Sequence, residues 1–255
     1  MMPPIFVISL VRAEKRRAEI RERMRASGFR YEFIDAVDGA AEDLPALVGT
    51  RGGGGSIVDD RLYRLTRGRP LSNGEIGCYL SHYLAWEKVA ALPAKCALIF
   101  EDDARWDDDL PQVIADIVSS GQQWGACLLT DDKGKCAFRK LHPVGENRFL
   151  GYPLKRTMAL AGYLLTPRAA KNLCARLRFI YEPVDIAMCR HWEWNEMRLS
   201  VRPHVVRHDE NETTINDRGS GGDERTVWNQ ILGGVVNIPE WCRRFLYYRA
   251  SRPRK

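Results

Sequence analysis

Short apolar runs alternate with longer segments of helical periodicity along most of this 255-residue chain. Residues 5–10 predict a first strand, residues 13–27 a charged helix that ends at Gly28, and residues 31–34 a second strand. Because a helix joins these two strands, we expect them to be parallel. The alternation continues through strands at 96–100, 126–130 and 160–166, and helices from Ser72, at 110–120 and at 168–178. It predicts a single α/β domain with a Rossmann-type, mostly parallel sheet flanked by helices.

Three carboxylates, Glu101, Asp102 and Asp103, directly follow the apolar strand at residues 96–100. Ligands of open α/β sheets bind just beyond the carboxyl ends of such strands. Adjacent acids repel one another unless a cation lies among them, and carboxylate oxygens suit Mg²⁺ or Mn²⁺. Acids in this place also often begin the next helix or face water. Because an uninterrupted apolar strand leads directly to these acids, we favour a metal site that serves chemistry on a nucleotide or sugar nucleotide.

The helix from Ser72 carries two more candidate site residues. Ser72 and Glu75 have the Ser-x-x-Glu spacing of a capping box, which would give Glu75 a purely structural role. Glu75 nevertheless shares one helical stripe with His82 and with Cys78, Tyr79 and Trp86. An acid and a histidine are unusual in an apolar stripe, so both remain candidates. For His82 the alternative is a buried histidine with satisfied hydrogen bonds.

Two single acids also follow predicted elements. Asp131 comes directly after the strand at 126–130, so parallel strands would bring it to the same edge of the sheet as the acids at 101–103. Asp185 lies near the amino end of a short helix that begins at Glu182-Pro183. The alternative for Asp185 is an acid that only stabilises the helix dipole.

The formal net charge of +6 is concentrated at the carboxyl end of the chain. Residues 240–255 hold six cations and one anion, so the other 239 residues carry only +1. A nucleic-acid-binding protein would spread its basic surface over the folded body, and we expect no such activity. Aromatic and apolar residues interleave with the basic ones, which favours peripheral contact with an anionic membrane. A solvated end with one packed helix is the alternative.

Other features of composition narrow the class of protein. No apolar run reaches the roughly 18–20 residues of a membrane span. The apolar stretch near the amino end is short and precedes its charges, unlike a signal peptide, so we expect a cytoplasmic protein, peripheral on the inner face of the cell membrane if the basic end binds lipid. Seven scattered cysteines contain no Cys-x-x-Cys pair, which disfavours a disulfide framework or a structural zinc site.

Several sequence blocks resemble glycosyltransferase family 25, the lipooligosaccharide galactosyltransferase family. GEIGCYLSH within residues 71–89 and IFEDD at residues 99–103 carry the resemblance. Supporting blocks in the same order are FVISLVRAEKRRAEI, FIDAVDG, AGYLLTPRAAKNL, EPVDIAM and, more weakly, RPHVVRHDENETTI. The resemblance implies a GT-A-like glycosyltransferase domain over residues 1–215. Residues 216–255 lie beyond it, and their composition predicts a small helical and basic tail.

The resemblance also implies an inverting transferase that moves a sugar, galactose foremost, from a UDP-sugar to a hydroxyl of a glycolipid or oligosaccharide acceptor. It places Arg16 or Arg17 near the donor diphosphate and Asp35 near the nucleoside. From residue type alone, the alternative for either arginine is a solvated helix cation. We group Ser9, His82, Glu101 and Asp102 with these donor-binding residues. A scaffold or binding protein with the same fold, or another nucleotide-sugar-dependent transferase, is the alternative function.

Metal and base assignments follow from this expected chemistry. Asp103, with Asp102, is expected to hold Mn²⁺ or Mg²⁺ against the leaving diphosphate. His208 replaces a glutamine that is frequent in the family, and is either a third metal ligand or a surface residue. Inversion in one step needs a general base, for which Asp185, Asp131 and Glu75 are candidates in that order.

Overall fold

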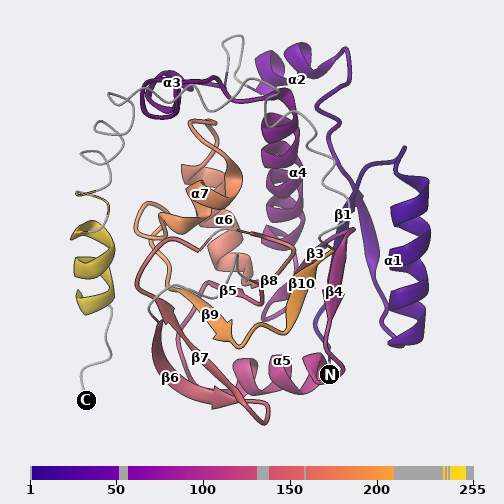
Figure 1. Ribbon diagram of the computed structural model, residues 1–255, viewed down its shortest axis with the longest axis vertical. Helices are drawn as coiled ribbons and strands as arrows, with labels where there is room; N and C mark the ends of the chain where they lie inside the picture. The colour runs from indigo at the N-terminus through magenta and orange to yellow at the C-terminus, as the bar shows by residue number, and fades with distance from the viewer. Residues whose placement is uncertain are drawn as a thin grey trace.

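The computed structural model of the chain describes residues 2–51, 57–130, 138–157, 159–209, 238, 240 and 242–250. Its strands are β1 (Ile5–Ser9), β2 (Glu32–Asp35), β3 (Ala97–Glu101), β4 (Ala104–Trp106), β5 (Ala126–Leu128), β6 (Phe138–Val144), β7 (Arg148–Pro153), β8 (Gly162–Leu165), β9 (Arg198–Arg202) and β10 (Val206–His208). Its helices are α1 (Glu14–Ala26), α2 (Leu44–Arg51), α3 (Arg61–Arg67), α4 (Asn73–Ala90), α5 (Leu110–Ser119), α6 (Pro167–Arg176) and α7 (Val184–Cys189). Figure 1 shows their arrangement.

One large sheet organises the domain, with strand order β2-β1-β3-β8-β5-β9-β7-β6. The predicted parallel pair of β1 and β2 is confirmed, and β3 joins β1 in the same direction. Strands β8 and β7 run opposite to their neighbours, whereas the other six point the same way. The predicted α/β fold with a mostly parallel, helix-flanked sheet is therefore confirmed, with β8 as an antiparallel insertion between β3 and β5.

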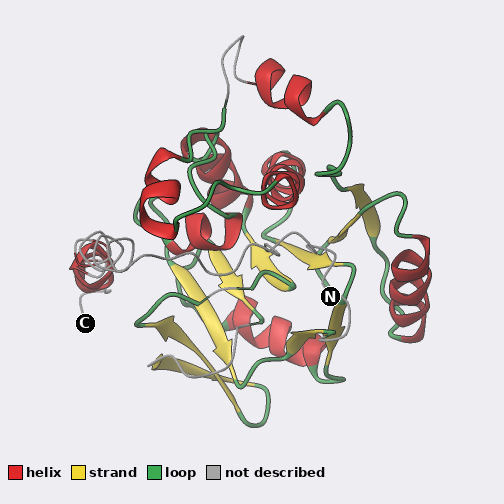
Figure 2. Ribbon diagram, turned by 45° about the horizontal axis from the view of Figure 1, so that its top comes forward, coloured by secondary structure: helices red, strands yellow, loops and turns green. Residues whose placement is uncertain are grey.

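Hydrophobic cores form on both faces of this sheet, which explains why its central strands are continuously apolar. In β3, Ala97 and Ile99 face the core beneath α4 and α6, whereas Leu98 and Phe100 face the core that includes residues of α1 and α5. Figure 2 shows helices on both sides of the sheet. In a strand that is buried on both faces, every residue must be apolar, so polar and apolar residues do not alternate. Its first polar residues come where the strand leaves the core.

Helix α4 begins as its sequence predicts. The Ser72 hydroxyl accepts a hydrogen bond from the Glu75 amide, and the Glu75 carboxylate accepts one from the Ser72 amide. Its first turns lie directly against the loop after β2, because Gly77 has no side chain. A Cβ on Gly77 would come within 2.7 Å of the Val37 carbonyl oxygen. The blocks FIDAVDG and GEIGCYLSH thus meet in one backbone contact.

The C-terminal helix, residues 242–250, packs on the domain through one face. Tyr248 is 4% exposed and stacks on Tyr152 of β7, with ring centroids 4.3 Å apart. On the same helix, Phe245 and Leu246 are exposed. The expected boundary at residues 215 and 216 lies outside the described residues. Within the described part of the chain, every helix is too short or too polar to cross a bilayer.

Candidate functional site

The parallel strands β2, β1 and β3 end side by side at one edge of the sheet. Register places Asp35 beside Ser9, and Glu101 beside Ile8. Asp102 follows Glu101, and its Oδ2 accepts a hydrogen bond of 2.6 Å from the Ser9 hydroxyl. The predicted donor-site residues of three distant sequence blocks are thus brought together at the carboxyl edge, where open α/β sheets bind ligands.

Two arginines of α1 reach this edge. Arg17 donates to the Ser9 carbonyl oxygen at 2.8 Å and to the Asp35 carboxylate at 2.5 Å. A guanidinium nitrogen of Arg16 lies 3.3 Å from Oδ1 of Asp102. Each of these arginine side chains is only 13% exposed, which contradicts the alternative of solvated helix cations. Their arrangement can neutralise an anionic group at the strand ends.

Asp103 is the electrostatically least satisfied group at this edge. Its Oδ1 is buried and has no hydrogen-bond partner. Burial, together with the charges of Glu101 and Asp102, raises the pKa of Asp103 to about 7. Burial likewise raises the pKa of Asp102, against the opposing effects of Ser9 and Arg16. A cation among these carboxylates would relieve both the desolvation and the mutual repulsion.

The acids open into a cleft of about 700 Å³ between α1 and the segment that joins β3 to β4. Asp102 and Asp103 line it together with Lys15, Arg16, Arg23 and Arg105. A cleft of this size suits a small charged ligand. Three further acids, Glu19, Glu22 and Asp209, also line it, so its mixed walls provide partners for both a phosphate group and a divalent cation.

Asp102 and Asp103 fit a hard divalent cation by ligand type, and Asp103 has an oxygen available for it. His208 pairs with Ala104 across β10 and β4 and lies close enough to lower the pKa of Glu101 electrostatically. The side chain of His208 is exposed, as expected for a surface residue. The ligand atoms of Asp102, Asp103 and His208 do not all lie within 4.8 Å of one another, so side-chain rotation would have to complete this set.

His82 is held inside the domain by both ring nitrogens. Its Nδ1 is 2.9 Å from the Tyr163 hydroxyl and its Nε2 is 3.1 Å from Oε1 of Glu101. Trp86 donates its indole N–H to the same Tyr163 oxygen. Burial raises the pKa of Glu101, but the combined effects of His82, His208 and Arg16 outweigh it and keep the pKa below its ordinary value. The alternative of a satisfied buried histidine is confirmed, and His82 acts on the site by orienting Glu101.

Sequence reasoning missed the hydroxyl that orients His82. Tyr163 lies in β8, where an apolar strand pattern gives no indication of a polar role. Only the antiparallel pairing of β8 with β3, which places Tyr163 beside Ile99, brings it under α4. The stripe on α4 did place Trp86 with His82, so part of this connection could be read from the periodicity.

The three candidate bases have different surroundings. The carboxylate of Glu75 already accepts hydrogen bonds from the helix cap and from Arg69, which donates to both of its oxygens at 2.8 Å. Burial raises the pKa of Glu75, but hydrogen bonds from Arg69 and Ser72 outweigh it and leave the pKa lowered. Such a carboxylate is a weak proton acceptor, and its structural role is confirmed. Asp131 lies outside the described residues.

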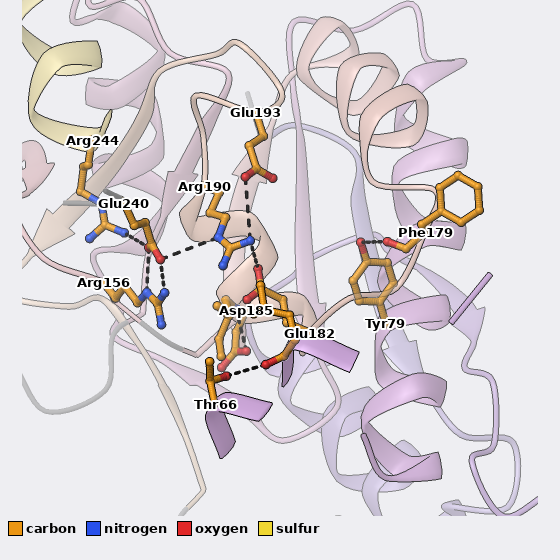
Figure 3. A network of polar contacts seen from close by, with 12 residues as sticks. Thr66, Tyr79, Arg156, Phe179, Glu182, Asp185, Arg190, Glu193, Glu240 and Arg244 are labelled. Atoms are coloured by element: carbon orange, nitrogen blue, oxygen red, sulfur yellow. Dashed lines mark hydrogen bonds and ion pairs between the residues drawn. The ribbon is translucent and has the colours of Figure 1, made fainter. Parts of the chain in front are cut away.

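Asp185 belongs to α7 and lies beside Glu182 in a group of charged side chains, shown in Figure 3. Its Oδ1 accepts a hydrogen bond from the adjacent Ile186 amide, as the helix-terminus alternative expects. Arg190 contacts Glu182 at 3.0 Å and connects this group to Glu240 near the C-terminal helix. The network therefore joins α7 to the end of the chain.

Comparisons with known proteins agree with the sequence blocks. Residues 2–188 match the model of a family described as glycosyltransferase family 25 (LPS biosynthesis protein). The inactive glycosyltransferase 25 family member 3 of Homo sapiens is 33% identical, over 62% of this chain and 25% of that protein. The lipooligosaccharide biosynthesis protein lic2B of Haemophilus influenzae is 25% identical, over 68% of this chain and 62% of that protein.

A procollagen galactosyltransferase 1 of Danio rerio is also 25% identical, over 66% of this chain and 28% of that protein. The chain spans about a quarter of the length of the first animal relatives that it matches. The matched family region contains the complete strand edge, the arginines of α1, helix α4 and the acids after β3. The chain belongs to glycosyltransferase family 25.

Proposed function

We propose that this protein transfers a sugar, galactose foremost, from a UDP-sugar to a hydroxyl of a lipooligosaccharide or another surface glycan. The observation that supports this most strongly is the buried, unpartnered oxygen of Asp103 in a cleft that also holds Arg16. Family membership and relatives named for lipooligosaccharide biosynthesis and galactosyl transfer support the substrate class. Intact Glu101, Asp102 and Asp103 favour this function over that of a non-catalytic scaffold.

Each charged group at the strand edge would have a separate role in this reaction. The nucleoside would lie near Asp35, which Arg17 fixes in place, and the diphosphate near Arg16. Asp102 and Asp103 would hold Mn²⁺ or Mg²⁺, with His208 as the third ligand. The cation would stabilise the charge that develops on the leaving diphosphate. His82 keeps Glu101 ionised and oriented at the same edge.

A carboxylate must also accept the proton of the attacking acceptor hydroxyl. We keep Asp185 and Asp131 as candidates and set Glu75 aside, because Arg69 and the helix cap already use its oxygens. Strand β5, which precedes Asp131 in sequence, points toward the same edge as β3. Inversion at the anomeric carbon is part of the proposal, and the stereochemistry of the product would test it directly.

Chelation should abolish the reaction reversibly. We expect that EDTA removes transfer from UDP-galactose to a lipooligosaccharide-derived acceptor, and that excess Mn²⁺ restores it, because the cation would stabilise the charge that develops on the leaving diphosphate. Product formation with and without chelator is the measurement. Full turnover in EDTA would mean that the cation is dispensable. No turnover in Mn²⁺ with a broad panel of UDP-sugars and acceptors would favour the scaffold, as in the relatives named inactive.

We further propose that the exposed face of the C-terminal helix contacts an anionic membrane surface. Phe245 is 46% and Leu246 63% exposed, and Arg243 and Arg249 are exposed on the same helix. Apolar side chains flanked by arginines suit the boundary between headgroups and acyl chains. Removing residues 240–255 would be a poor test, because it also removes the buried Tyr248.

Replacing Phe245 and Leu246 together by serine is the sharper test. We expect roughly tenfold weaker binding to vesicles that contain phosphatidylserine, because less apolar area enters the bilayer. Vesicle cosedimentation measures the effect, and activity on a soluble acceptor should not change. Leu62→Ser provides the control, since Leu62 is 51% exposed on α3. Equal vesicle binding by the double variant and the wild type would refute membrane contact through this helix.

A further inference from the structure

A second group of metal-ligating side chains lies beneath the acids, on the α4 side of the sheet edge. Cys78 and His82 are four residues apart on α4, so both project from one face of the helix. Glu101 reaches the same place from the end of β3. One ligand atom from each of the three residues lies within 4.8 Å of the other two. Among the described residues this is the one trio of Cys, His and acidic ligands that meets so closely.

The ligand types in this trio differ from those at Asp103. A thiol, an imidazole and a carboxylate are the set that binds Zn²⁺ in proteins, whereas Mn²⁺ and Mg²⁺ prefer oxygen ligands alone. Three protein ligands leave a fourth position of a tetrahedral ion for water or a substrate group. The chemistry of the trio therefore selects a softer ion than the one expected at the neighbouring acids.

The geometry around His82 is that of a prepared metal ligand. Two ligands of one tetrahedral zinc ion lie about 3.3–3.5 Å apart, given bond lengths of about 2.0–2.2 Å. Nε2 of His82 and Oε1 of Glu101 are 3.1 Å apart, so they require little adjustment. The Cys78 sulfur lies within 4.8 Å of both atoms, so a side-chain rotation that moves it by no more than about 1 Å would complete the set.

The surroundings of His82 also supply the supporting contact that ligating histidines usually have. Such histidines bind the ion with one ring nitrogen and donate the other N–H to a fixed acceptor. The Tyr163 oxygen lies 2.9 Å from Nδ1, and Trp86 holds that oxygen in place. Tyr163 is fully buried, so its position does not depend on solvent.

We infer that Cys78, His82 and Glu101 form a site for Zn²⁺ or a similarly soft divalent cation, and that its occupation inhibits the transferase. On binding, the Cys78 thiol loses its proton to solvent, and His82 changes from the Nε2–H to the Nδ1–H tautomer. The Tyr163 hydroxyl then turns from donating a hydrogen bond to Nδ1 to accepting one from it. Glu101 exchanges its hydrogen bond from His82 for a bond to the ion. The predicted inhibition rests on the proposed function, because it requires that Glu101 leave its place at the donor edge. The predicted binding of the metal ion does not rest on the proposed function.

Cobalt(II) provides a direct probe of the binding. We expect that adding Co²⁺ to the whole protein produces an absorption band from thiolate-to-cobalt charge transfer, with one ion per chain. The band should disappear in Cys78→Ala, and Zn²⁺ should bind this variant at least about tenfold more weakly. Loss of a residue that only supports a ligand typically lowers metal affinity by about 10- to 100-fold, and loss of a ligand should cost at least as much. Cys242→Ala is the matched control, because Cys242 is an exposed thiol on the C-terminal helix.

Two further variants separate this site from the acids and from loss of folding. Glu101→Gln keeps a hydrogen-bond acceptor for His82 but removes the carboxylate, so Co²⁺ should bind it more weakly in a protein with unchanged circular dichroism. Asp103→Ala should keep the full thiolate band, even though transfer is lost. A band that persists in Cys78→Ala, or no thiolate band in the wild type, would overturn the site.

Inhibition is tested separately by adding Zn²⁺ to the Mn²⁺-loaded enzyme during turnover. We expect Zn²⁺ to inhibit the wild type and the Cys242→Ala variant at concentrations at least about tenfold lower than those that inhibit Cys78→Ala. Equal inhibition of all three would show that zinc acts elsewhere. If the protein transfers no sugar at all, the proposed function fails, whereas the cobalt experiment still decides whether the trio binds metal.

Discussion

Replacing Asp103 by asparagine is expected to lower transfer by roughly 10²–10³-fold or more, the range lost when one group that stabilises transition-state charge is removed. The amide keeps the shape of the side chain but loses the negative charge that would hold the cation. Initial rates of sugar transfer in saturating Mn²⁺ measure the effect. Asp108→Asn is a suitable control, because Asp108 is exposed on the segment after β4. Undiminished turnover in Asp103→Asn would refute the assignment.

The same variant should fold at least as well as the wild type. The pKa of Asp103 rises from an ordinary value of 3.8 to about 7 in the metal-free fold. The folded state therefore binds more protons than the unfolded state between these values, so ionisation of Asp103 destabilises the fold as the pH rises through this window. Asparagine does not ionise. Without metal at pH 8, Asp103→Asn should melt at a higher temperature than the wild type, which separates lost catalysis from lost structure.

Replacing Gly77 by alanine is expected to destabilise the domain by about 1–3 kcal/mol, the usual cost of overpacking. A Cβ there would lie 2.7 Å from the Val37 carbonyl oxygen and 2.8 Å from the Gly39 amide nitrogen, closer than such contacts allow. Both neighbours are backbone atoms, so α4 and the loop after β2 must separate. That loop follows Asp35 and holds its place partly through the Ser81 hydroxyl, which accepts from the Val37 amide.

Gly49→Ala offers a matched control for this contact. Its added Cβ would meet nothing within 4 Å, and it lies in α2, where alanine is the better helix former. Chemical denaturation of both variants gives the comparison, and we expect Gly49→Ala to be neutral or more stable. If Gly77→Ala unfolded with the wild-type free energy, the tight approach of α4 to the loop would be wrong.

Hydrophobic periodicity was sufficient to predict the elements at the donor edge. Strands β1, β2, β3, β5 and β8 and helices α1, α4, α5, α6 and α7 all lie where the pattern placed them, because each buries a continuous stripe or run. The pattern did not predict strands β4, β6, β7, β9 and β10 or helices α2 and α3. Of these, β4 and β10 have three residues each and pair with one another outside the large sheet, so neither shows an alternation long enough to recognise.

Contacts between distant segments explain what the sequence left open at the site. The acids after β3 were identifiable because they follow an apolar run without interruption. The family resemblance named Arg16 or Arg17 without choosing between them. The residue pattern could not make the choice, since a charged helix presents many arginines and only the fold selects the one that meets Ser9 and Asp35. Glu75 shows the opposite case. Its capping box was readable, but Arg69, the partner that saturates the carboxylate, lies before the helix in an unpatterned segment.

Electron paramagnetic resonance, with Mn²⁺ titrated in the presence and absence of UDP, measures directly whether the acids after β3 hold a cation. We expect one tightly bound ion per wild-type chain in the presence of UDP. Asp103→Asn should bind it at least about tenfold more weakly, because the amide replaces a negatively charged oxygen ligand. Cys78→Ala should bind Mn²⁺ as the wild type does. Equal Mn²⁺ affinity in the wild type and in Asp103→Asn would contradict a cation held by the acids after β3.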